Sequence, residues 1–160
     1  MEFTKKARVE GAENEKIKVV LVLIAMEAEA KPFIEKLGLA EQSLNLGPCM
    51  SYKGDVGDLT VVCVTNGKDI RHSVDNVGTT PAAISTFIAI NMYKPCLIIN
   101  AGTAGGFNRQ GGNIGDVYIC NNFSHHDRRI PIPGFENYGM GKHETIGVNN
   151  LVSVSYLLYG

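Results

Sequence analysis

Two glutamates, Glu27 and Glu29, follow an apolar run that covers residues 19–26. Open α/β sheets bind their ligands at the carboxyl ends of their strands, which is where these side chains would lie. A carboxylate there can take a proton from water and direct that water at a bound substrate. Two residues apart on a helix, the side chains point in different directions, so we expect at most one to face a cleft. The alternative is that both only stabilise the first turn of a helix through its dipole.

Residues 100–106 form a second candidate, because a buried apolar run leads there into Gly102, Thr103, Gly105 and Gly106. Glycine lets a backbone approach a ligand closely, and successive N–H groups can form an anion nest. The pattern is not G-x-G-x-x-G, and no P-loop lysine follows, which argues against dinucleotide or nucleoside triphosphate binding. We favour a ligand-binding turn, with a plain strand-to-loop turn as the alternative.

A third candidate is the run of charged and polar residues that begins at His125 and His126. Adjacent histidines on an extended segment point to opposite faces, so they cannot chelate one metal ion together. The pair His126 and Asp127 has no nucleophile motif beside it, which favours a structural role. The apolar loop that follows, residues 130–135, fits a contact patch and packing over its own core equally well.

The first elements that must position these groups are a strand and a helix. The β-branched and leucine residues of 19–25 predict a strand buried on both faces. A helical stripe then predicts a helix over 27–37, with Pro32 near its start or at a kink and Gly38 at its end. Residues 50–55 and 59–65 predict a β-hairpin or two neighbouring strands.

Further along the chain, helix and strand signals continue to alternate. Thr79, Thr80 and Pro81 predict a helix start with a threonine cap and proline at the first position. Residues 96–100 and 117–120 predict two more buried strands. This alternation favours a mostly parallel sheet with helices on its faces, in one domain. The expected apolar stripe of the helix consists of Ala83, Ile84, Phe87, Ile88 and Met92.

The composition of the chain limits the classes of partner that it is expected to bind. The chain has 160 residues, 19% of them charged, and a formal net charge of -1, so we expect neither nucleic acid nor a membrane as partner. The longest apolar run, residues 19–26, is far below the ~20 residues that span a bilayer. Residues 1–16 mix Lys, Arg and Glu, which predicts a solvated tail and not a signal peptide. Cys63, Cys96 and Cys120 lie in apolar runs, where free cysteine behaves as a small hydrophobe, so we expect a cytoplasmic protein.

Four segments in this order resemble the plant 5′-methylthioadenosine/S-adenosylhomocysteine nucleosidases of the nucleoside phosphorylase superfamily. They are residues 26–29, 100–106, 113–116 and 126–133, and the similarity runs from about residue 18 to about residue 141. The resemblance implies a three-layer α/β/α domain that forms a homodimer. It also implies hydrolysis of the bond between adenine and a 5′-thio-substituted ribose, through an oxocarbenium-like transition state and without a metal or organic cofactor.

The resemblance also implies roles for individual residues. Glu29 matches the glutamate that activates the attacking water, and Met26 matches a ribose-contacting position. Thr103 matches the hydroxyl at the ribose and water corner, and Ala104 and Gly105 continue that substrate-binding turn. The loop at residues 130–135 resembles one that, in relatives, reaches toward the partner subunit's pocket.

Phosphorolysis is the competing chemistry, and it needs cationic groups that hold phosphate. No arginine lies between Val9 and Ile70, and Arg71 is the only one before Arg109 near the expected cleft. This favours hydrolysis, although Lys68 leaves a nucleoside phosphorylase open as an alternative.

The sequence departs from the family toward its end. The acid Asp that protonates adenine and the ribose-binding Glu of a Met-Glu-Gly segment come later in the family, and no match is found here. We therefore expect a tail at 1–16, a partial, incomplete domain at 17–145 and a divergent end at 146–160, as in a truncated chain of little activity. Two alternatives are a storage-like, non-catalytic protein on the same fold and a fragment that modulates a full-length subunit.

Overall fold

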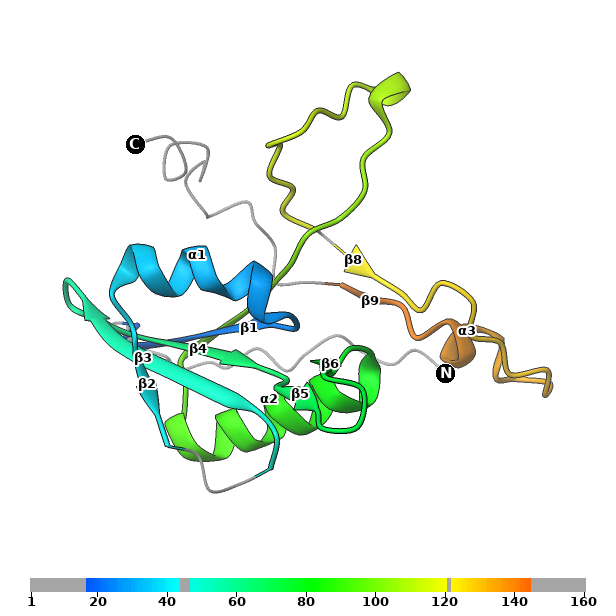
Figure 1. Cartoon of the computed structure of the whole chain (residues 1–160). Helices are drawn as coiled ribbons and strands as arrows, with labels where there is room; N and C mark the ends of the chain where they lie inside the picture. The colour runs from blue at the N-terminus through cyan, green and yellow to red at the C-terminus, as the bar shows by residue number, and fades with distance from the viewer. Residues whose placement is uncertain (1–16, 44–46, 121, 145–160) are drawn as a thin grey trace. The chain divides into compact units, whose positions relative to one another are not determined.

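The computed structural model describes residues 17–43, 47–120 and 122–144 (Figure 1). The chain divides into two compact units, residues 1–104 and 105–160, which are considered separately below. Within the described ranges, no helix is long and apolar enough to cross a membrane. The domain boundaries expected from the sequence stay predictions.

The first unit is built on a five-stranded sheet with the order β2-β3-β4-β1-β7. Strand β1 (Val19–Ile24) runs parallel to both of its neighbours, β4 (Leu59–Thr65) and β7 (Leu97–Ala101). Strands β2 (Ala40–Gln42) and β3 (Met50–Val56) add an antiparallel extension on the β4 side. The predicted strand at 19–25 and the predicted hairpin at 50–65 are thereby confirmed.

Alternation along the central strands divides the core into two layers. Val20, Val22 and Ile24 pack with helix α1 (Glu27–Leu37) on one face of the sheet, whereas Leu21 and Leu23 pack toward helix α2 (Thr79–Tyr93) on the other. Figure 1 shows the two helices on opposite sides of the sheet. The result is the three-layer α/β/α arrangement that the resemblance implied, and β1 is buried on both faces as expected.

Helix α1 follows its prediction closely. It ends at Gly38, which adopts the left-handed conformation (φ 61°) that costs glycine little. Pro32 lies inside the helix, and the buried Ala30 faces the sheet. Met26 is the N-cap residue and makes no side-chain capping hydrogen bond, so the first turn needs acceptors from elsewhere.

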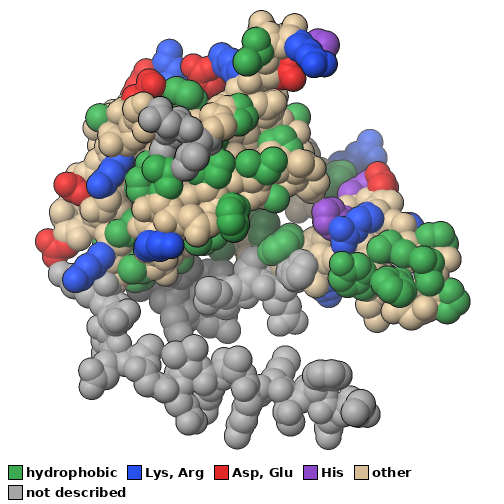
Figure 2. Space-filling view, turned by 90° about the horizontal axis from the view of Figure 1, so that it is seen from below, with side chains coloured by type: hydrophobic (Ala, Val, Ile, Leu, Met, Phe, Trp, Pro, Cys, Tyr) green, Lys and Arg blue, Asp and Glu red, His purple; other side chains and the backbone are tan. Residues whose placement is uncertain are grey.

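Helix α2 (Thr79–Tyr93) exists as predicted, but its start and its buried face were predicted wrongly. Gly78, not a threonine, is the N-cap residue. The buried positions are Ser85 and Ala89, whereas Phe87 of the expected stripe is 70% exposed. The helix is apolar nearly all round, so the spacing of its apolar residues does not identify the buried face. The small side chains of Ser85 and Ala89 let the helix approach the sheet closely. Figure 2 shows hydrophobic side chains on the surface of this side of the first unit.

Two strand predictions also need correction. Strand β7 forms, but Ile98 and Ile99 are 43% and 42% exposed, because within the described residues β7 pairs only with β1. Residues 117–120 form no regular strand, and Val117 and Tyr118 are largely exposed. An apolar run becomes a strand only where a neighbouring strand supplies hydrogen bonds.

Between β4 and α2 the chain forms a small antiparallel ribbon. Strand β5 (Lys68–Asp69) pairs with β6 (Val74–Asp75), and Lys68 lies directly opposite Asp75. The Asp69 carboxylate accepts hydrogen bonds from the backbone N–H groups of Arg71 and His72 at 2.9 and 2.8 Å, which closes the turn.

In the second unit, strand β8 (Asn122–Phe123) pairs with β9 (His143–Glu144), and a short helix α3 (Glu136–Met140) follows the 130–135 loop. A 3₁₀ turn, η1, covers Asn108–Gln110. The Arg128 guanidinium donates to the carbonyl oxygen of Gly139 at 2.7 Å and so ties the segment before this loop to helix α3 after it.

Candidate functional site

The centre of the candidate site is a contact between Glu29 and Thr103. The Oε1 atom of Glu29 accepts hydrogen bonds from the Thr103 backbone N–H at 2.8 Å and from the Thr103 hydroxyl at 2.6 Å. Glu29 lies in the first turn of α1 and Thr103 lies two residues after β7. Since β1 and β7 are parallel neighbours, with Ile24 opposite Ala101, their carboxyl ends meet at one edge of the sheet. The structure therefore brings together two of the residues singled out in the sequence.

These hydrogen bonds keep the Glu29 carboxylate ionised. The Thr103 hydroxyl lowers the pKa of Glu29 below 4.5, with further lowering by the Thr103 and Met26 backbone N–H groups and a smaller opposing effect of burial. At neutral pH the side chain is thus an anion that can accept a proton. A Cβ added at Gly102 would lie 3.6 Å from Glu29 Oε2, an ordinary van der Waals contact, so the glycine turn passes close to the carboxylate.

Glu27 has different partners, as expected from its spacing. Its Oε2 atom lies 2.5 Å from Lys68 Nζ, and its backbone N–H donates to Asp75 Oδ1 at 3.3 Å. Lys68 lowers the pKa of Glu27 through a hydrogen bond and its charge, and Glu27 in turn raises the pKa of Lys68. One carboxylate therefore meets the glycine turn, and the other meets the β5–β6 ribbon.

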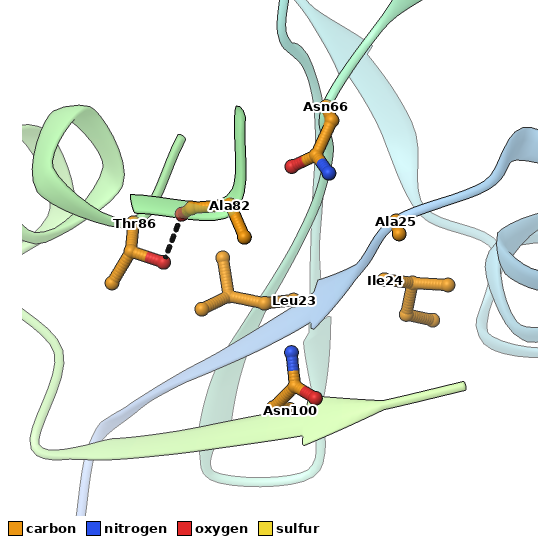
Figure 3. A pocket seen from close by; sticks show the side chains of 7 residues that line it. All are labelled: Leu23, Ile24, Ala25, Asn66, Ala82, Thr86 and Asn100. Atoms are coloured by element: carbon orange, nitrogen blue, oxygen red, sulfur yellow. Dashed lines mark hydrogen bonds between the residues drawn. The ribbon is translucent and has the colours of Figure 1, made fainter. Parts of the chain in front are cut away.

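A small cavity lies at the carboxyl ends of the parallel strands, beside the beginning of α2 (Figure 3). Its volume of about 20 Å³ holds one water molecule at most and not a nucleoside. In this view the amide side chains of Asn66 and Asn100 lie on either side of Leu23. Sequence reasoning missed Asn66, although its place directly after β4, beside the end of β1, was an available signal. The lining residues are Leu23, Ile24, Ala25, Asn66, Ala82, Thr86 and Asn100.

The other predicted site residues are less constrained. Met26 is the N-cap residue of α1 and is 39% exposed. Ala104 is the last residue of the first unit and is exposed, and Gly105 is the first of the second unit. Nothing lies within 4 Å of the position that a Cβ at Gly105 would take. Their substrate-binding roles stay predictions.

In the histidine segment the structure shows one local contact, and the structural role expected for the segment stays a prediction. His126 Nδ1 lies 2.8 Å from Asp127 Oδ2, and both side chains are almost fully exposed. Among the described residues, no group of three or more His, Cys, Asp or Glu side chains is arranged to hold a metal ion.

Comparison with known proteins adds a family model and close relatives. Residues 19–156 match the model described as the phosphorylase superfamily. A 5′-methylthioadenosine nucleosidase of Arabidopsis thaliana is 44% identical over 148 residues, which are 90% of this chain and 55% of the relative. A 5′-methylthioadenosine/S-adenosylhomocysteine nucleosidase from the same plant is 40% identical over 152 residues, 92% of this chain and 60% of the relative.

The fold agrees with a solved structure of such a relative. The apo structure of Arabidopsis thaliana 5′-methylthioadenosine nucleosidase superimposes with a TM-score of 0.77 at 44% identity, over 82% of this chain and 55% of that chain. The chain thus spans 55–60% of the length of these two Arabidopsis relatives.

Proposed function

The chain belongs to the phosphorylase superfamily, and from this premise we propose that its first unit holds the water- and ribose-binding half of a nucleosidase site. The substrate is 5′-methylthioadenosine, with S-adenosylhomocysteine as a second substrate, and the reaction is hydrolysis of the N-glycosidic bond. The observation that carries this proposal is the contact of Glu29 with Thr103 at the carboxyl ends of β1 and β7. The names of the relatives at 40–44% identity support the choice of substrate.

In this reaction the ionised Glu29 takes a proton from a water molecule whose oxygen forms a bond to the anomeric carbon of the ribose. The bond between that carbon and the adenine nitrogen breaks, and its electron pair leaves with adenine, which then needs a proton from a general acid. Thr103 holds one carboxylate oxygen in place and so limits the directions that Glu29 can take. Met26, Ala104 and Gly105 are proposed to contact the ribose side.

The state of Lys68 supports water over phosphate as the nucleophile. Phosphorolysis needs an available cation. Lys68, near this edge of the sheet, is the residue whose charge kept phosphorolysis as an alternative in the sequence analysis. Its ammonium group is paired with Glu27, which neutralises the charge that a phosphate would need.

We also propose that the protein acts as a homodimer in the cytoplasm, in methionine salvage. The apolar surface of α2, with Ile84 half-exposed and Phe87 largely exposed, supports association with a second copy. Sedimentation of the purified chain tests the homodimer, and a monomer at micromolar concentration would contradict it.

The nucleosidase proposal is tested by titrating the purified chain with methylthioadenosine and recording backbone amide shifts by NMR. We expect the Thr103 and Glu29 amides to shift, and the shifts to weaken in Thr103→Val. Shifts confined to other segments, or none at millimolar ligand, would contradict the proposed site.

Adenine release provides the second readout. We expect these 160 residues by themselves to release adenine about 10²–10⁴-fold more slowly than the Arabidopsis relative, because that is the usual contribution of a general acid. The residual rate should disappear in Glu29→Gln. Turnover near that of the relative would refute this expectation.

A further inference from the structure

Helix α1 carries Glu29, but its N-cap residue supplies no side-chain acceptor, and the β5–β6 ribbon supplies one. The N-cap residue, Met26, has no side-chain acceptor for the first N–H groups. The N–H of Glu27 donates instead to Asp75 Oδ1, from a residue 48 positions further along the chain. A helix terminus capped from a distant segment is held in place by that segment.

A second attachment comes from the opposite strand of the same ribbon. Lys68 Nζ pairs with the Glu27 side chain, and Lys68 lies directly across from Asp75 in the β5–β6 register. One residue, Glu27, is thus held through its backbone by one strand and through its side chain by the other. Two contacts of different direction restrict rotation of the first turn as well as its translation.

The ribbon is itself anchored to the sheet and cannot follow the helix freely. The amide groups of Asn66 and Asn76 donate to each other's backbone carbonyl oxygens at 2.9 and 3.3 Å, and the Asn76 N–H donates to the Gly67 carbonyl. Gly67 has φ 69°, and a Cβ there would lie 1.5 Å from the carbonyl oxygen of Pro48. The base of the ribbon is therefore packed tightly against its surroundings.

We propose that Lys68 and Asp75 are positioning residues that clamp the first turn of α1 and thereby hold Glu29 against Thr103. This role rests on the proposed function of Glu29, which lies two residues beyond the clamped Glu27 in the same turn. Neither residue needs to touch the substrate. The clamp fixes the orientation of the Glu29 carboxylate. A change in that orientation would alter the hydrogen bonds that Thr103 donates to it.

An ordinary surface ion pair is the competing explanation, and the two differ in a measurable way. Lys68 and Glu27 are both more than half exposed, and exposed pairs contribute little to stability. If the pair is only a surface contact, its removal changes the titration of Glu27 and leaves Glu29 unchanged. If the clamp exists, its removal disturbs the titration of Glu29 as well as that of Glu27.

The test uses the full chain with ¹³C-labelled glutamate, so that each carboxylate is titrated by NMR. The clamp-free variant combines Lys68→Met with Asp75→Ala, which remove the charge and the acceptor. The matched variant combines Lys68→Arg with Asp75→Asn, which keep both. Lys31→Met is the control for the loss of a lysine charge, because Lys31 pairs with Glu35 on the same helix and lowers the pKa of Glu27 through its charge.

We expect the pKa of Glu29 to rise toward its ordinary value in the clamp-free variant and the Thr103 amide signal to shift. The matched variant and Lys31→Met should retain the Glu29 titration and the Thr103 amide signal of the unmodified chain. A clamp-free variant with unchanged Glu29 titration and unchanged Thr103 signal would overturn the proposal. If Glu29 responds but methylthioadenosine does not bind, the clamp stands and the proposed function fails.

Discussion

Replacing Thr103 by valine isolates the hydroxyl that contacts Glu29. Valine keeps the β-branched shape and the backbone N–H, which donates at 2.8 Å, and removes only the 2.6 Å hydrogen bond from the hydroxyl. A hydrogen bond to a charged group contributes about 1.5–3 kcal/mol when well shielded, and exposed charge interactions contribute about 0.2–1 kcal/mol. Thr103 is exposed, so we expect a loss of about 1 kcal/mol in the free energy of unfolding at pH 7.

The dependence of this loss on pH follows from the ionisation of Glu29. The Thr103 hydrogen bonds lower the pKa of the folded state, so their stabilisation is present above the ordinary glutamate pKa of 4.5. It is lost as the pH falls through the lower folded-state value, where the carboxylate takes up a proton. The difference between the unmodified chain and Thr103→Val should therefore shrink markedly at pH 3.

Urea unfolding followed by far-ultraviolet circular dichroism at pH 7 and pH 3 measures both values. Thr103→Ser, which retains the hydroxyl, is the matched control and should behave nearly as the unmodified chain does. An equal loss at both pH values would refute the reasoning, because the contribution of Thr103 would then come from packing and not from its contact with a carboxylate.

Two further predictions concern the core and the base of the β5–β6 ribbon. Gly67→Ala should destabilise the chain by more than about 2 kcal/mol, because a side chain there meets both a left-handed conformation and a backbone oxygen. Gly57→Ala, at a similar φ with open space around it, is the control, and an equal loss in both would contradict the role of the clash. Burial raises the pKa of Cys63 to about 12, so iodoacetamide at pH 8 should leave Cys63 unmodified in the folded chain while the exposed Cys96 and Cys120 react, as followed by mass spectrometry. Alkylation of Cys63 at the rate of the exposed thiols would contradict this.

Local patterns were sufficient for a strand buried along its whole length and for a helix with one polar face. The continuous apolar run of β1 and the polar face of α1 led to correct predictions for both elements, and Gly38 marked the helix end. Helix α2 shows the limit, because a helix that is apolar nearly all round carries no periodic signal. The prediction at 117–120 shows another limit, since a strand needs a partner that the run itself does not specify.

The residue types of the candidate site were likewise determined by the sequence, since a carboxylate and a hydroxyl at the ends of two strands predict where chemistry can occur. Only the tertiary structure decided that Glu29 and Thr103 touch, because the parallel pairing of β1 with β7 brings together residues 74 positions apart. The roles of Lys68 and Asp75 were also beyond sequence reasoning. Their strands have two residues each, too few for any periodicity, and their contacts with Glu27 exist only once the sheet has placed the ribbon beside α1.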